Sequence, residues 1–302
     1  MRKFTKIETR NEINGFLFAM PVILGILIFT YYPAVKSLFY AFTNFNGAKK
    51  CDFVGFNMFK LMFNDDDTLL VYKNTFIYAI ISIPLNMLLG YLLALLANFK
   101  LKGISVFRTL FYLPVIIPGV ASALVFKDMF STGTEGVLNN FLVNMGLSPY
   151  KFFDSEHTAM LSLIYMNTWT IGGSMITWLA SFKNIPVTLY ESAKLDGASV
   201  LKQLIYITIP MSTSMIFYNL VTGVIGALQT NQTLILFSGG NGQAGLGPEK
   251  SLYFICVKIY NEAFGNWRQG YASAYAWMLF IVIAAFTALI FKTSKWVYYG
   301  DD

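Results

Sequence analysis

The side chains in this sequence that could do chemistry are amides, hydroxyls and indoles set inside long apolar segments. They are Asn86, Asn167, Trp169, Ser174, Trp178, Asn219, Thr222, Gln229, Thr230, Asn231 and Gln232. Amides hydrogen-bond hydroxyl groups without carrying a charge, and aromatic faces cover the apolar C–H face of a pyranose ring. The set predicts binding of a neutral, hydroxyl-rich solute. For any one of these residues, a hydrogen bond between helices, worth about 0.6 kcal/mol, is the more common role.

The run from Gln229 to Gln232 is the most informative part of this set. Four adjacent polar residues at the end of an apolar segment cannot all face packed neighbours, so at least one should meet water or solute. Polar and small residues on the other apolar segments complete a predicted translocation path. The predicted path consists of Asn167, Trp169, Gly173, Asn219, Gln229, Thr230 and Asn231.

No catalytic residue and no metal site is expected. A Ser–His hydrolase would need a histidine within an apolar segment, but the single histidine, His157, lies at the margin of one, next to Glu156. The apolar segments contain no pair of acids and no cluster of metal ligands. The pattern therefore argues against an intramembrane serine protease or glycosyltransferase.

The composition places these residues in a membrane. Hydrophobic residues make up 56% of the 302 residues, charged residues make up 13%, and the mean hydropathy is +0.55. A helix needs about 20 mostly apolar residues to cross roughly 30 Å of hydrocarbon. The predicted spans are 14–36, 74–98, 106–127, 158–182, 206–230 and 270–291. The sequence therefore predicts an all-α polytopic membrane protein in which residues 1–302 form a single transmembrane domain.

Lysines and arginines collect on one side of the predicted spans. They occur in the N-terminal tail, in the turn before 106–127, in the segment 183–210 and in the C-terminal tail. Positively charged short loops stay in the cytoplasm, so both termini are predicted to be cytoplasmic. The net charge of +6 then reflects topology and not nucleic-acid binding. Cys51 and Cys256 fall on the opposite side, where two unpaired thiols are favoured over a disulfide.

The segment 183–210 is polar and helix-patterned, although it lies between two predicted spans. Thr188 and Glu191 fit a capping box, which predicts that a helix begins there. Gly197, about two turns later, predicts a left-handed residue that ends this helix. A second helical piece, 199–207, then leads into the next span.

Such a helix–turn–helix could serve two purposes. Ala193 and Ala198 are small enough to allow close approach of another protein. Alternatively, Leu189, Tyr190 and Leu195 would supply the apolar face of a helix that rests on lipid. Residue spacing alone does not separate these interpretations.

The residues of this segment resemble a known signature. ESAKLDG at 191–197, followed ten residues later by ITIP at 207–210, is similar to the E-A-A-x-x-x-G-(x)9-I-x-L-P motif of permease subunits in bacterial ABC importers. Ser192 and Ile209 are the two departures, and both are mild. The resemblance covers nearly the whole chain and is strongest to the maltose-type sugar permeases. Further matching stretches are Asn167-Thr168-Trp169, Asp196-Gly197-Ala198, Ser238-Gly239-Gly240, Ile259-Tyr260-Asn261-Glu262-Ala263-Phe264 and Gly270-Tyr271-Ala272-Ser273-Ala274.

This resemblance implies a type I ABC importer fold with six transmembrane helices and a cytoplasmic coupling helix between spans 4 and 5. It implies four kinds of partner: a second homologous permease subunit, two ATPase subunits, an extracytoplasmic solute-binding protein and a carbohydrate substrate. ATP and Mg would be bound by the ATPase subunits, and this chain would hold no cofactor and hydrolyse nothing. The chain would lie in the bacterial cytoplasmic membrane. The residues implied to couple to the ATPase are Glu191, Ser192, Ala193, Asp196, Gly197 and Ala198.

The lack of charged residues in the predicted spans bears on both the energy source and the type of solute. The interiors of the predicted spans contain no Asp, Glu, Lys or Arg, and 203–248 contains none at all. Ion-coupled carriers usually keep ionisable residues at membrane depth despite a cost of about 2.5–3.5 kcal/mol each. The sequence thus favours a neutral oligosaccharide or glycoside driven by an external energy source. The alternatives are a permease for glycerol phosphate or another polyol-type solute and, outside the family, an ion-coupled secondary carrier.

Overall fold

The structure is a computed structural model that describes residues 6–48, 51–99, 102–132, 136–237 and 244–298. Within these ranges the regular structure is helical, with one isolated bridge between Thr43 and Phe53, so the all-α prediction is confirmed. The first half contains α1 (Lys6–Ile26), η1 (Leu27–Tyr31), α2 (Tyr32–Tyr40), α3 (Asn57–Phe63), α4 (Asp66–Ala97), α5 (Ile104–Ile116), α6 (Gly119–Met129), α7 (Val137–Asn144) and α8 (Glu156–Thr168).

The second half begins with α9 (Gly172–Lys183) and α10 (Val187–Leu195) and ends with a long helix, α16. Between them lie short elements that include two π-helices, η3 and η5. The remaining elements are α11 (Val200–Gln203), η3 (Leu204–Thr208), α12 (Ile209–Met211), α13 (Thr213–Leu228), α14 (Thr233–Leu236), η4 (Pro248–Lys250), α15 (Ile255–Tyr260), η5 (Asn261–Gly265), α16 (Gln269–Lys292) and η6 (Ser294–Trp296).

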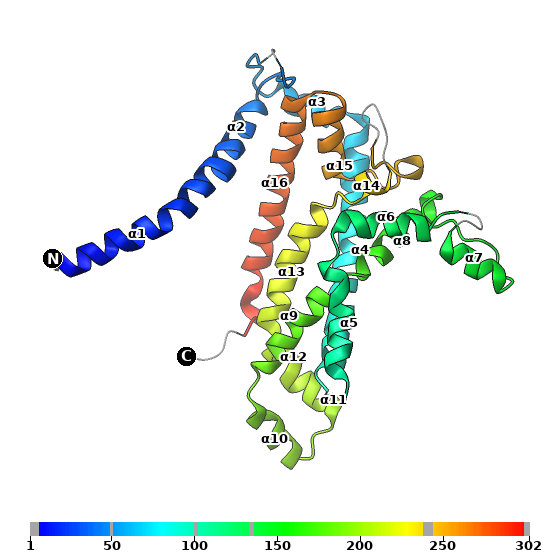
Figure 1. The fold of residues 1–302 in the computed structure, drawn as a ribbon. Helices are drawn as coiled ribbons and strands as arrows, with labels where there is room; N and C mark the ends of the chain where they lie inside the picture. Colours follow the sequence, from blue (N-terminus) through cyan, green and yellow to red (C-terminus); the bar gives the residue numbers. More distant parts are fainter. Residues whose placement is uncertain (1–5, 49–50, 100–101, 133–135, 238–243, 299–302) are drawn as a thin grey trace.

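Three described helical stretches are long and apolar enough to cross a membrane: Asn14–Tyr40, Asp66–Ala97 and Gln269–Lys292. Two bent helix pairs pass the same test together, which gives up to five spans in the described part of the chain. Figure 1 shows the long helices running between two ends of the molecule, with α3 and α15 at one end and α10 at the other. We refer to these as the α15 end and the α10 end.

The predicted span 106–127 is sharply bent in the structure. α5 and α6 meet at 97°, and α5 with its 13 residues is only about 20 Å long. The break has a local cause. Pro118 disfavours the helical conformation at the residue before it, and Ile117 accordingly is extended, with φ −72° and ψ 128°.

The predicted span 158–182 is also interrupted. α8 ends at Thr168 and α9 begins at Gly172, with Trp169–Ile171 forming a turn between them. Gly172 packs so closely on α5 that a Cβ there would overlap the carbonyl oxygen of Phe111. The interruption therefore lies where another helix approaches the chain most closely.

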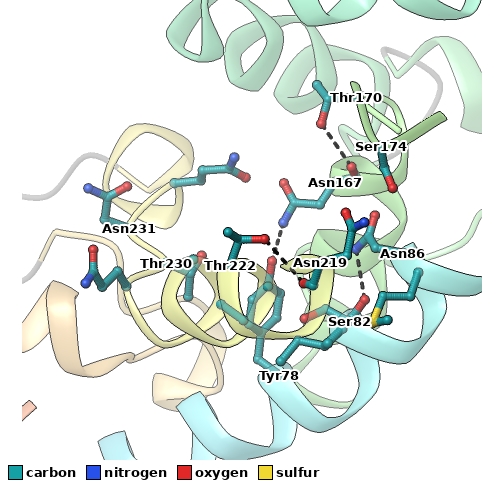
Figure 2. Close-up of a pocket in the computed structure, with 17 residues that line it drawn as sticks. Tyr78, Ser82, Asn86, Asn167, Thr170, Ser174, Asn219, Thr222, Thr230 and Asn231 are labelled. Carbon is teal, nitrogen blue, oxygen red and sulfur yellow. Dashed lines mark hydrogen bonds between the residues drawn. The ribbon is translucent and has the colours of Figure 1, made fainter. Parts of the chain in front are cut away.

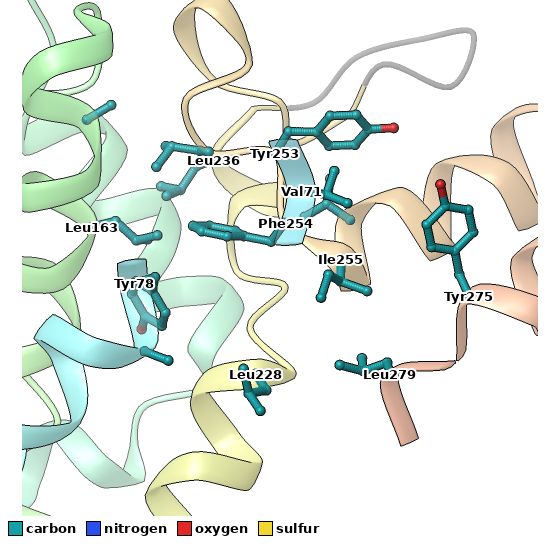
Figure 3. Close-up of a cluster of buried hydrophobic side chains, with 14 of the residues drawn as sticks. Val71, Tyr78, Leu163, Leu228, Leu236, Tyr253, Phe254, Ile255, Tyr275 and Leu279 are labelled. Atoms are coloured by element: carbon teal, nitrogen blue, oxygen red, sulfur yellow. The ribbon is translucent and has the colours of Figure 1, made fainter. Parts of the chain in front are cut away.

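Helix α4 is the centre of the packing. It contacts α8, α9, α13 and α15, and its small residue Gly90 lets Ser174 of α9 approach its backbone. Towards the α15 end, the side chains of Tyr78, Leu163, Phe254 and Leu228 pack into one buried apolar cluster (Figure 3). A second cluster, towards the α10 end, consists of Ala94, Ala97, Met175, Trp178, Leu179 and Phe182.

Helix α1 stands apart from this core. Figure 1 shows it projecting away from the other helices, and none of the apolar window within Asn14–Tyr40 is buried. Phe18, for example, is 90% exposed. A helix this apolar is stable only in lipid or against another apolar surface.

A buried ion network fixes the loop that carries α15. Lys258 is 4% exposed, and its Nζ lies 2.9 Å from Asp65 Oδ2 and 3.4 Å from Glu262 Oε1. Burial by itself would lower the pKa of Lys258, but the hydrogen bond and charge of Asp65, together with the neighbouring Tyr253 and Tyr275, outweigh burial and hold that pKa above its ordinary value. The start of α4 adds neutral contacts, because Asn74 Nδ2 donates to the Lys250 carbonyl at 2.9 Å and Thr75 Oγ1 accepts from Ile255 N at 3.1 Å. Both cysteines are unpaired, as expected.

Replacement of Lys258 by Met should destabilise the protein by about 3–5 kcal/mol, because Asp65 and Glu262 lose a buried counter-charge. The matched control is Lys250→Met, which removes a side chain that is 45% exposed and bonded to Asp67 at 2.6 Å. This control should cost less than about 1 kcal/mol. Thermal unfolding of both variants in detergent checks the difference, and equal shifts would contradict it.

Candidate functional site

A polar cavity of about 450 Å³ lies where α4, the α8–α9 turn and α13 meet (Figure 2). Its wall on α4 follows helical spacing, with Tyr78, Ser82 and Asn86 four residues apart on one face. The lining residues are Tyr78, Ser82, Ile83, Asn86, Met87, Asn167, Thr170, Ser174, Asn219, Thr222, Gly223, Gly226, Ala227, Gln229, Thr230, Asn231 and Gln232. None of these residues carries a charge, so the cavity presents only neutral polar groups and apolar surface.

Three amide groups in this wall each use one N–H donor in a hydrogen bond within the protein. Asn167 Nδ2 donates to Tyr78 Oη at 2.6 Å, Asn86 Nδ2 to the Ser82 carbonyl at 2.9 Å and Asn219 Nδ2 to the Met215 carbonyl at 2.9 Å. Each bond fixes the orientation of its amide and leaves the amide oxygen as an acceptor. The wall is therefore built in advance to accept hydrogen bonds from hydroxyl groups.

The mouth of the cavity supplies further polar groups. The side chains of Gln229 and Asn231 are exposed and make no hydrogen bond within the described residues. Gln232 Oε1 is buried without a partner among those residues. An unsatisfied buried acceptor is costly, and a hydroxylated solute or water in the cavity would satisfy it.

The structure brings five of the seven predicted path residues together around this cavity: Asn167, Asn219, Gln229, Thr230 and Asn231. The other two lie elsewhere. Trp169 lines a separate apolar cavity of about 460 Å³, where its ring meets that of Phe126 at 5.8 Å between centroids. Gly173 faces Val115, with 3.7 Å between its would-be Cβ and Val115 Cγ1.

Tyr78, Ser82 and Thr170 line the cavity but are absent from the predicted path. The four-residue spacing of Tyr78, Ser82 and Asn86 is a signal that could have identified the first two. Trp178, by contrast, was included among the polar candidates but is buried against Tyr91 in the second apolar cluster.

A second exposed feature lies at the α10 end. Helix α10 begins at Val187 after Pro186, and no side chain caps its N-terminus. The predicted Thr188–Glu191 capping box is therefore wrong. The helix begins two residues too early for Thr188 to occupy the cap position, because Pro186 is the N-cap, and Thr188 lies within the first turn.

The predicted end of this helix is confirmed. Gly197 has φ +75°, Ala198 N donates to the Ala193 carbonyl at 2.8 Å, and Gly197 N donates to the Lys194 carbonyl at 3.1 Å. This pair of bonds is a Schellman motif, which requires the left-handed residue that glycine provides without strain. The turn directs the chain into α11.

The surface of α10 is uncovered. None of its side chains is buried, and among the residues implied to couple to an ATPase, Glu191, Ser192, Asp196 and Gly197 are exposed. Ala193 and Ala198 are half-buried. Next to them, Leu195 is 90% and Val200 is 75% exposed. Exposed apolar side chains around small residues are typical of a surface that docks another protein.

Comparison with known proteins establishes the family. The chain is 35% identical to the probable ABC transporter permease protein YesP of Bacillus subtilis over 99% of this chain and 96% of that protein. It is 30% identical to the lactose transport system permease protein LacF of Rhizobium radiobacter over 96% and 97% of the two chains. The chain belongs to the permease family of sugar ABC transporters. No protein-family model matches it.

The fold supports this membership. A solved permease chain from a bacterial ABC transporter that imports the acidic polysaccharide alginate superposes with a TM-score of 0.83 at 25% identity, covering 96% of this chain and 99% of that one. The predicted resemblance to ABC importer permeases is confirmed. As a sugar permease, the chain is a membrane protein and a transport subunit. The matching stretch 238–240 lies outside the described residues.

The tight approach of α5 to α9 can be tested by adding one methyl group. Gly172→Ala would press a Cβ into the Phe111 carbonyl and should destabilise the permease by about 1–3 kcal/mol. Gly226→Ala is the matched control, because nothing lies within 4 Å of its would-be Cβ and alanine favours the helix. Thermal unfolding should show opposite signs for the two variants, and a neutral Gly172→Ala would contradict the close contact.

Proposed function

We propose that this permease forms one half of the translocation path of an ATP-driven, binding-protein-dependent importer for a neutral carbohydrate, either an oligosaccharide or a glycoside. The observation that carries the proposal is the uncharged cavity lined by amide and hydroxyl groups between α4, α8–α9 and α13. Oriented acceptors such as Asn86 and Asn219 suit sugar hydroxyls, and the apolar surface of Ile83 and Met87 suits C–H faces.

The absence of cations in the cavity lining favours a neutral solute. The structural neighbour imports an acidic polysaccharide, whereas the lining residues here include no Lys or Arg. An anion transferred into such a wall would lose its hydration without gaining a counter-charge. The same reasoning disfavours glycerol phosphate. A neutral polyol would fit the chemistry of the wall, and the lactose and other sugar permeases among the relatives favour a saccharide over it.

We further propose six spans, in which α8 and α9 cross together despite the turn between them, and both termini in the cytoplasm. The α10 end carries Lys183, Lys194 and Lys202, which supports a cytoplasmic location. The proposed partners are a second homologous permease, two ATPases that bind ATP and Mg, and an extracytoplasmic solute-binding protein. A neighbour of this fold has been solved with a periplasmic protein bound to an alginate pentasaccharide, which supports the last of these. The exposed surface of α10 supports the ATPase contact.

An ion-coupled carrier is the competing function. Such a carrier would need an ionisable group on the path, and the cavity lining has none. The carrier would also leave the exposed, apolar α10 surface without a partner.

Filling the cavity should stop transport without unfolding the protein. Gly226→Leu places a bulky side chain in the cavity wall, whereas Gly226→Ala leaves most of the space. We expect saccharide uptake by the reconstituted importer to fall at least about ten-fold with leucine and to change little with alanine. The double variant Gln229→Ala/Asn231→Ala should lower uptake by roughly ten-fold through lost hydrogen bonds. Normal uptake by both the leucine and the double variant would remove this cavity from the path.

Reversing the charge on α10 tests the ATPase contact. Glu191→Arg should abolish both co-purification of the ATPase subunits and ATP-dependent uptake, because it introduces a cation into the proposed interface. Lys183→Glu on α9, also exposed, changes the charge outside α10 and serves as the control. Affinity purification in mild detergent, followed by mass spectrometry, measures assembly. Recovery of the unmodified chain alone, active in liposomes without ATP, would establish the carrier instead.

A further inference from the structure

Helix α10 is almost detached from the rest of the permease. It buries no side chain, and Figure 1 shows it as a separate segment below α12 and α11. Within the described residues, its side chains make a single hydrogen bond outside the helix, between Tyr190 Oη and Thr208 Oγ1 at 2.9 Å. No ion pair joins α10 to the part of the chain that the structure describes. Among the residues that the structure describes, Tyr190 thus provides the only side-chain hydrogen bond that ties α10 to another element; we call this bond the tether.

The partner of Tyr190, the hydroxyl group of Thr208, is buried and held in a fixed orientation. Thr208 is 6% exposed, and its hydroxyl donates to the Gln203 carbonyl at 3.4 Å, which leaves a lone pair to accept the Tyr190 hydroxyl. Gln203 Nε2 in turn donates to the Ala198 carbonyl at 2.9 Å. The bonds from Tyr190 through Thr208 and Gln203 to Ala198 therefore close a ring. This ring braces α10, the Gly197 turn and α11 as one unit.

Thr208 also precedes α13, the helix that forms one wall of the polar cavity. It is the last residue of the π-helix η3, and π-helical turns often occur at functional positions. Four residues later, at Ser212, the chain bends by 62° into α13. Helix α13 carries Asn219 and Gly226 into the polar cavity. When α10 moves, the Tyr190–Thr208 bond therefore pulls on the chain one helical turn before the bend at Ser212. That bend sets the direction of α13, which forms one wall of the cavity.

We propose that Tyr190 and Thr208 are positioning residues that transmit the movement of α10 to α13, and so couple the ATPase cycle to the solute cavity. The proposal rests on the proposed importer function and adds the route by which coupling enters the membrane domain. Without the tether, α10 would still dock, because its exposed surface is unchanged. Its movement would then be taken up by the Gly197 turn and would no longer reach the bend at Ser212.

The experiment uses the complete importer reconstituted in liposomes, with saccharide uptake and ATP hydrolysis measured on the same vesicles. Tyr190→Phe and Thr208→Val each remove one hydroxyl with little change of shape. Thr208→Ser keeps the hydroxyl and should restore coupling. Tyr206→Phe is the matched control, since Tyr206 lies on the same turn, is 76% exposed and makes no hydrogen bond through its hydroxyl within the described residues.

We expect Tyr190→Phe and Thr208→Val each to lower the saccharide transported per ATP hydrolysed by about five-fold, with assembly unchanged. The double variant should be no worse than Thr208→Val alone, because the Tyr190–Thr208 bond is already lost in that variant. An unchanged ratio in Tyr190→Phe, or an equal loss in Tyr206→Phe, would overturn the proposal. If the unmodified chain neither recruits an ATPase nor requires ATP, the proposed function itself fails, which is a separate and distinguishable result.

Discussion

The packing of α9 and α13 against α4 is the interaction on which the rest of the structure depends. Gly90 lets Ser174 approach the backbone of α4, and Gly223 brings α13 within van der Waals contact of Ile83. In a membrane, helix association relies on such close contacts because lipid already solvates apolar side chains. The polar face of α4, with Tyr78, Ser82 and Asn86, then has no lipid to face and becomes a cavity wall. The same packing thus stabilises the fold and creates the candidate site.

Several helices are interrupted close to the positions where they pack against their neighbours. The chain changes direction at Ile117 and at Ser212, and its helix is interrupted at Trp169–Ile171. Irregular backbone at membrane depth is tolerated only where it is buried in protein or lines a polar cavity. Two of the three breaks border the polar cavity or the bend that positions its wall. The breaks at Trp169–Ile171 and Ser212 belong to the elements whose polar side chains meet those of α4 in the cavity.

The charged side chains lie away from the polar cavity. Lys258 and its carboxylate partners form a compact network at the α15 end, where each charge has a counter-charge. The α10 end is charged and exposed. Between these ends the cavity is lined by neutral groups, which cost less free energy to desolvate than charged groups. The uncharged cavity and the exposed α10 surface are therefore separate features of the permease, and the chain connects them from α10 to α13.

The sequence by itself determined the membrane location, the apolar segments, the Gly197 turn and the family, because each depends on composition or on residues adjacent along the chain. The predicted path was determined only in part. Gln229–Asn231 follow from a local anomaly, whereas Tyr78 and Thr170 enter the cavity because of how α4, α8 and α13 pack. The same packing directs Trp169 and Gly173 away from it. The bend at Pro118 was implied by local chemistry, but its 97° angle was not. Only the tertiary structure decides which helix faces meet, since side-chain spacing defines a face but not its neighbour.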